Sequence, residues 1–101
     1  MNAEINEILQ RDLSVKARAE ALNALGKRYA DRQDTDAAIL CWEKSVECYG
    51  KPGFAQAQLM MAYNAKRRAC SQAGDGAGVE HYSVKIDALM QQSKDAIRYG
   101  F

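Results

Sequence analysis

Residues 22–42 read LNALGKRYADRQDTDAAILCW, and this stretch decides the fold. Two runs with apolar residues at helical spacing lie on either side of the polar segment Gln33-Asp34-Thr35-Asp36. Aspartate and threonine prefer turns and helix caps, because their short side chains hydrogen-bond to the neighbouring backbone. A glycine inside a helix costs about 1 kcal/mol relative to alanine, so Gly26 needs a packing reason. We therefore expect a helical hairpin whose helices approach closely at the small residues Gly26 and Ala38.

Helical periodicity continues on both sides of this hairpin. We expect helices over residues 2–13, 15–32, 36–49, 54–73 and 79–98. Ser14 is the expected N-cap of the second helix, and Gly50 with Pro52 ends the third. The glycine-rich segment Gly74–Gly78 is expected to be a flexible turn.

The short links between these helices and the lack of any strand pattern favour antiparallel neighbours in an all-α array of about five helices. A chain of 101 residues is a single domain. We divide it into an N-terminal capping helix over residues 1–13, a first hairpin over 14–50 and a second, elongated hairpin over 54–98.

The order of large and small side chains in the first hairpin resembles the tetratricopeptide repeat. That family has the pattern Trp-x2-Leu-Gly-x2-Tyr, then an alanine, an aromatic residue and a closing proline. The matching residues here are Leu22, Leu25, Gly26 and Tyr29, followed by Ala38, Trp42 and Ser45. The chain departs from the pattern at the first aromatic residue, at the closing proline and at the turn glycine. Gln33 replaces that glycine, so a looser turn is expected. The alternative to the resemblance is an unrelated helical hairpin that matches the pattern by chance.

A second, weaker unit follows the first. Leu59 and Tyr63 lie 34 residues after Leu25 and Tyr29, while Met60 replaces the glycine. Gly78 and Tyr82 take the places of Ala38 and Trp42. The chain thus resembles one good repeat and one degenerate, elongated repeat. About three repeats are usual for a stable array, so the terminal segments, a second copy of the chain or a partner must cover its ends.

The resemblance implies that the first helix of each unit lines a concave groove. Residues 14–33 carry five basic and two acidic side chains, and residues 51–73 carry four basic and no acidic ones. Residues 34–50 carry one basic and four acidic side chains. A basic groove would attract an acidic segment of another protein. The alternative is that these charges only solvate exposed faces.

Mapping the family's groove onto this chain selects several candidate binding residues. Met61 would supply adaptable apolar contact. The groove positions are Asn23, Lys27, Ala57, Gln58, Met61 and Asn64, and the run Lys66, Arg67 and Arg68 extends their basic character.

Other function classes have little support in the sequence. A net charge of +1 argues against nucleic-acid binding, even with the basic run at residues 66–68. His81 is the only histidine and has no evident nucleophile partner, so catalysis is not expected. Three cysteines without CxxC spacing make a poor zinc or disulfide framework, and no cofactor motif is present.

No segment approaches the roughly 20 apolar residues of a membrane span, and no secretory leader is recognisable. The expected location is therefore the cytoplasm. The expected function is a small protein-interaction module: an adaptor, a chaperone or an inhibitor that binds a protein segment. The alternative is a structural or regulatory homo-oligomer assembled through the open ends of the array.

Overall fold

The computed structural model of the chain describes residues 2–49 and 53–98, with the side chains of all of these except 93 and 95–98. Its helices are α1 (Ala3–Gln10), α2 (Val15–Asp31), α3 (Thr35–Cys48), α4 (Phe54–Gln72) and α5 (Gly76–Arg98). The described residues contain no strand, which confirms the all-α prediction. The predicted helix stop at Gly50 and Pro52 lies outside the described residues.

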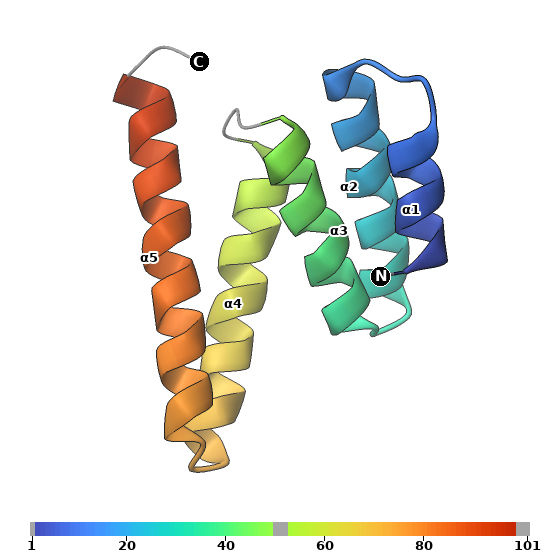
Figure 1. Cartoon of the computed structure of the whole chain (residues 1–101). Coiled ribbons are helices and arrows are strands. Elements are labelled where there is room, and N and C mark those ends of the chain that lie inside the picture. Colours follow the sequence, from blue (N-terminus) through green and yellow to red (C-terminus); the bar gives the residue numbers. More distant parts are fainter. Residues whose placement is uncertain (1, 50–52, 99–101) are drawn as a thin grey trace.

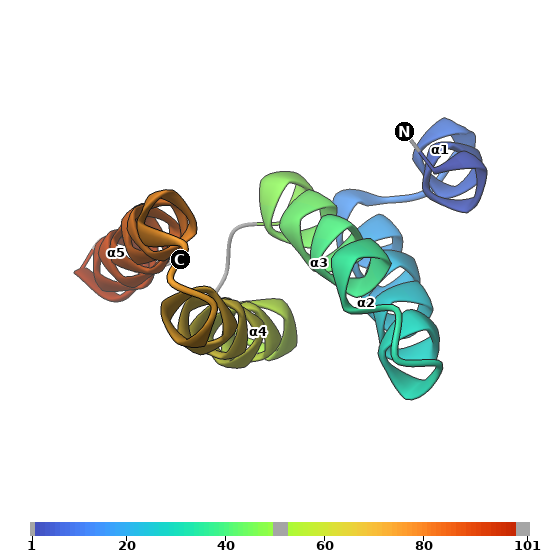
Figure 2. The same ribbon diagram turned by 90° about the horizontal axis from the view of Figure 1, so that it is seen from below.

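Helices that are neighbours in sequence are neighbours in space (Figure 1). The helix pairs α2–α3 and α4–α5 form antiparallel hairpins, and α1 packs on α2. Viewed along the helices, α3 lies between α2 and α4 and is displaced to one side of them, so the chain folds in a zigzag (Figure 2). The result is a flat array with extents of 44 × 35 × 20 Å.

The turn between α2 and α3 is a tight one. The Gln33 amide donates to the carbonyl of Ala30, and the Asp34 amide donates to that of Tyr29, both at 2.9 Å. This pair of bonds is a Schellman cap, which needs a left-handed residue at its centre. Gln33 adopts that conformation with φ 63°. The expectation that Gln33 loosens this turn is therefore wrong, because the glutamine backbone itself takes the left-handed form.

The turn between α4 and α5 repeats this geometry. Gly74 has φ 74° and its amide donates to Ser71, while the Asp75 amide donates to Cys70. The Asp75 carboxylate then accepts from the Gly78 amide at 3.0 Å, so α5 begins at Gly76. The prediction of a flexible turn through Gly78 is wrong, because the aspartate cap compensates for the low helix propensity of the glycines.

Side-chain caps also begin the other helices of the first half. Asn2 accepts from first-turn amides of α1. Ser14 accepts from Ala17 at 3.1 Å, which confirms its prediction as the N-cap of α2. Asp34 caps α3 in the same manner. These caps satisfy amides that an α-helix leaves unpaired at its start.

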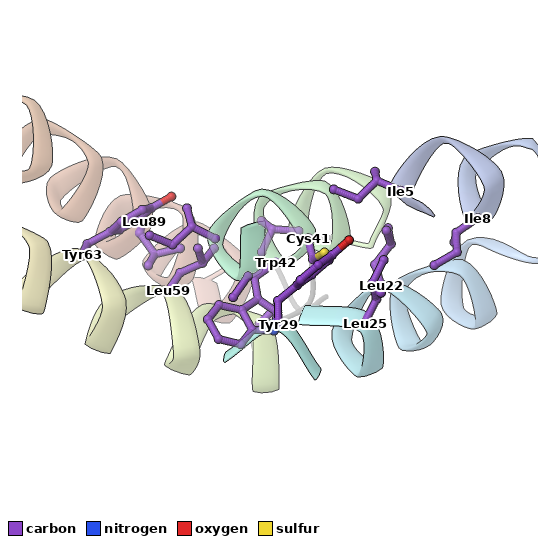
Figure 3. Packing of buried hydrophobic residues seen from close by; sticks show 14 of the residues in the cluster. Ile5, Ile8, Leu22, Leu25, Tyr29, Cys41, Trp42, Leu59, Tyr63 and Leu89 are labelled. Atoms are coloured by element: carbon purple, nitrogen blue, oxygen red, sulfur yellow. The ribbon is translucent and has the colours of Figure 1, made fainter. Parts of the chain in front are cut away.

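One cluster of buried apolar side chains runs through all five helices (Figure 3). Gly26 and Ala38 are buried where α2 meets α3, which confirms the packing reason for this glycine. The residues of the buried cluster that Figure 3 labels are Ile5, Ile8, Leu22, Leu25, Tyr29, Cys41, Trp42, Leu59, Tyr63 and Leu89. No helix in the described part of the chain is long and apolar enough to cross a membrane.

The α1 helix is tied to α2 by polar as well as apolar contacts. Ile5 is fully buried. The Tyr29 hydroxyl donates to the Glu4 carboxylate and accepts from the side-chain NH2 of Asn2, both at 2.6 Å. The hydrogen bond to Glu4 raises the pKa of Tyr29 above its usual value. The α1 helix thus covers the outer side of α2.

Candidate functional site

A groove lies between α2 and α4, with α3 as its floor; we call it the α2–α4 groove. It has a volume of about 210 Å³. Its lining residues are Ala30, Thr35, Ala38, Trp42, Gln58, Met61 and Ala62. None of these side chains is charged. The groove follows from the zigzag, which separates α2 from α4 across α3.

Two of the predicted groove residues, Gln58 and Met61, line the α2–α4 groove. Met61 is 63% exposed, although it is a large apolar side chain. Lys27 and Arg68 are exposed and lie outside the lining. Lys27 precedes the lining residue Ala30 by one turn of α2, and Arg68 follows Met61 by two turns of α4. Both therefore share a helix face with a residue of the groove.

Asn23 lies apart from these residues. It lines a separate hollow of about 150 Å³ between α2, α3 and the beginning of α4, together with Ser45 and Phe54. Its side-chain oxygen is buried and accepts no hydrogen bond from the described residues. The structure therefore does not bring Asn23 into the α2–α4 groove.

Three of the predicted residues in the second half of α4, Asn64, Lys66 and Arg67, are engaged within the protein. The side-chain NH2 of Asn64 donates to the Met60 carbonyl, and its side-chain oxygen accepts from Arg67, both at 2.9 Å. Lys66 forms an ion pair of 2.6 Å with Asp36, and this contact raises the pKa of Lys66. The ion pair ties α4 to the first turn of α3. None of these side chains lines the α2–α4 groove.

A second groove, which sequence reasoning missed, lies between α3 and α5 with α4 as its floor; we call it the α3–α5 groove. Two hollows of about 290 and 340 Å³ form it, and they share Glu43 and Lys85. The Lys85 ammonium donates to Glu43 at 2.8 Å. Glu43 and Lys85 are 42 positions apart in the sequence, so no local motif predicts their contact.

The Tyr63 hydroxyl donates to the same oxygen of Glu43, at 2.5 Å. The ammonium of Lys85 also lies 5.6 Å from the centre of the Tyr63 ring. Burial raises the pKa of Tyr63, and the hydrogen bond to Glu43 raises it further by a smaller amount. The tyrosine is therefore a neutral donor at ordinary pH. It joins α4 to α3 at the floor of the groove.

Within residues 2–49 and 53–98, no group of three or more histidine, cysteine, aspartate or glutamate side chains could hold a metal ion. Cys41, Cys48 and Cys70 are free thiols. His81 is exposed and packs edge-on against Tyr82.

No protein-family model matches the chain, and no curated protein or solved structure matches it significantly.

Proposed function

We propose that the chain is a protein-interaction module, a short array similar to tetratricopeptide repeats, that holds a segment of another protein in the α2–α4 groove. The observation that carries the proposal is the exposed Met61 beside an uncharged groove floored by Trp42. An exposed methionine at an apolar groove is typical of surfaces that adapt to a partner. Helix-in-groove binding uses apolar anchors of this kind.

The exposed cations beside the groove indicate the charge of the partner. Neither Lys27 nor Arg68 forms an ion pair with a described residue. A segment with an apolar anchor and flanking acidic residues would therefore place its anchor near Met61 and its acids near these cations. Such charges contribute to association rate and specificity more than to affinity.

The same groove favours a role without catalysis, since its lining contains no titratable side chain. An adaptor, a chaperone and an inhibitor all fit this description. We place the module in the cytoplasm, because free thiols suit a reducing compartment.

Self-assembly through the ends of the array has less support. Although Val84 and Met90 on α5 are exposed and apolar, most of the exposed side chains that the structure describes on the terminal helices are polar. They include Glu4, Glu7, Gln10, Glu80, Asp87, Gln91 and Lys94. Such faces favour water over a second copy. Sedimentation at micromolar concentration separates the two functions, because a strict monomer removes the homo-oligomer.

Peptide binding tests the proposed function directly. The acidic probe is a fluorescent amphipathic helix with leucines on one face and glutamates at its flanks. The basic probe is the same peptide with lysines in place of the glutamates. We expect the acidic probe to bind more tightly, and the Lys27→Glu/Arg68→Glu variant to lose that preference with an unchanged melting temperature. Arg28→Glu is the matched control, because this exposed residue lies on the α1 side of α2. Equal affinities for both probes, or equal loss in the control, would remove the proposal.

A further inference from the structure

The α3–α5 groove is lined by apolar side chains and by charged groups from both α3 and α5. Its two parts meet at Glu43 and Lys85, which line both of them. Leu40, in one wall, is 44% exposed although it is a large apolar side chain. The other apolar lining residues are Ile39, Val46, Leu59, Ala88 and Leu89. The groove therefore offers apolar contact to a side chain that reaches its floor.

The Glu43 carboxylate, near the centre of this groove, is only half used. Its Oε2 accepts from both Tyr63 and Lys85. No described residue donates to its Oε1. Because Tyr63 and Lys85 fix the carboxylate from α4 and α5, its free oxygen is held in place rather than mobile. A preorganised acceptor costs little ordering entropy when a donor arrives.

The lining of the groove carries an excess of negative charge. Three α3 carboxylates line it, those of Asp36, Glu43 and Glu47, against the single ammonium of Lys85 and the exposed His81. The lysines that pair with Asp36 and Glu47 lie outside the lining, and each contacts one oxygen of its partner. Each of the three carboxylates therefore keeps one oxygen that can accept a hydrogen bond from a cation.

We propose that the α3–α5 groove is a second interaction surface, which receives a lysine side chain of an apolar and basic protein segment. The aliphatic stem of the lysine lies against Leu59 and Leu89, and its ammonium donates to Glu43 Oε1 with Glu47 one helical turn away. Lysine fits this site because its long apolar stem and compact cation match an apolar wall that ends at carboxylates.

This inference is independent of the proposed function. The α2–α4 groove and the α3–α5 groove open between different helix pairs and share no lining residue. One is flanked by cations and the other is lined by carboxylates. A module with both surfaces connects two segments of opposite charge, as an adaptor requires.

Three synthetic peptides test the proposal. The first is a fluorescent amphipathic helix of alanine, leucine and glutamine with one central lysine on its leucine face; in the others norleucine or glutamate replaces the lysine. We expect the lysine peptide to bind about tenfold more tightly than the norleucine peptide, as for a charge-assisted hydrogen bond. The methyl resonances of Leu59 and Leu89 should shift on binding, whereas that of Met61 should not.

Two variants and a matched control complete the experiment. Glu43→Gln and Glu47→Gln should each remove most of the preference for lysine over norleucine. Glu47→Gln keeps the fold intact, because its side chain is 64% exposed and bonded only to Lys44. Glu80→Gln, on the exposed side of α5, should leave the preference unchanged. The proposal fails if the lysine and norleucine peptides bind equally, if Glu47→Gln has no effect, or if the Leu59 and Leu89 methyls shift on dilution of the free protein, which would show that a second copy occupies the groove.

Discussion

The indole of Trp42 lies directly against the α2 backbone at Gly26. A Cβ atom at this glycine would lie 2.5 Å from Nε1 and 2.8 Å from Cδ1 of the indole. Real Cβ atoms do not approach other atoms so closely, so only glycine permits this contact. Trp42 also lines the α2–α4 groove. The contact that closes the first hairpin therefore also sets the floor of the candidate binding site.

Gly26→Ala is predicted to lower the free energy of unfolding by about 1 kcal/mol, and by at most about 2 kcal/mol. Overpacking costs about 1–3 kcal/mol, and the better helix propensity of alanine offsets about 1 kcal/mol of it. Urea denaturation followed by circular dichroism measures the change. Gly76→Ala is the control, because no atom lies within 4 Å of its added Cβ. A Gly26→Ala variant as stable as the wild type would show that the indole moves away at little cost.

Tyr29→Phe is predicted to loosen α1. The substitution removes the hydroxyl that joins Asn2 and Glu4 to α2. A hydrogen bond to a charged group contributes about 1.5–3 kcal/mol to stability. This value is the upper limit of the expected decrease in the free energy that holds α1 on α2. Amide hydrogen exchange should speed up in α1 more than in α5. Tyr82→Phe is the control, since the Tyr82 hydroxyl has no hydrogen bond among the described residues; equal exchange in both variants would contradict the role of Tyr29.

The two hairpin turns predict opposite effects for two substitutions. Gln33→Gly should stabilise the protein by up to about 1 kcal/mol, because glycine adopts the left-handed conformation without the steric cost of a side chain. Gly74→Ala should destabilise it by a similar amount, since Gly74 has φ 74°. Thermal unfolding of the two variants measures both effects. If both shift the melting temperature in the same direction, backbone strain does not control these turns.

The helices could be predicted from the sequence because their signals are local. Apolar spacing, the cap at Ser14 and the polar break before Thr35 placed the first hairpin within one or two residues of its observed bounds. The predicted start of α5 at residue 79 is three residues too late, because the Asp75 cap allows the helix to begin at Gly76 among the glycines. The packing role of Gly26 was predicted correctly, since a mid-helix glycine has few other reasons to be there.

The site was less accessible to sequence reasoning. Helical register predicted Gln58 and Met61 as groove residues, and both line the α2–α4 groove. It did not show that Asn64 and Arg67 bond to each other, or that Asn23 lies in a different hollow. The α3–α5 groove depends on the approach of α3 to α5 across α4. No single-sequence pattern encodes a contact of that kind.

Cys41 is predicted to be the least reactive of the three thiols. Burial raises the pKa of Cys41 to about 11, and the side chain is inaccessible to solvent. At pH 8 iodoacetamide should therefore modify Cys48 and Cys70 well before Cys41, as mass spectrometry of the digested protein can show. Because the folded pKa exceeds the usual value of 9.0, the stability that depends on this proton is complete below pH 9 and declines as the pH rises towards 11. Equal labelling of all three thiols in the folded protein would contradict this burial.

The central claim is that the α2–α4 groove holds a segment of another protein. Its most direct test is photo-crosslinking in the cells that make the chain, with benzoylphenylalanine in place of Met61 and, as the matched control, in place of Val84, which is 61% exposed on α5. We expect one defined adduct with a different protein from position 61, its loss in the Lys27→Glu/Arg68→Glu background, and no such adduct from position 84. Adducts of equal yield from both positions, or an adduct that consists of two copies of this chain, would contradict the claim.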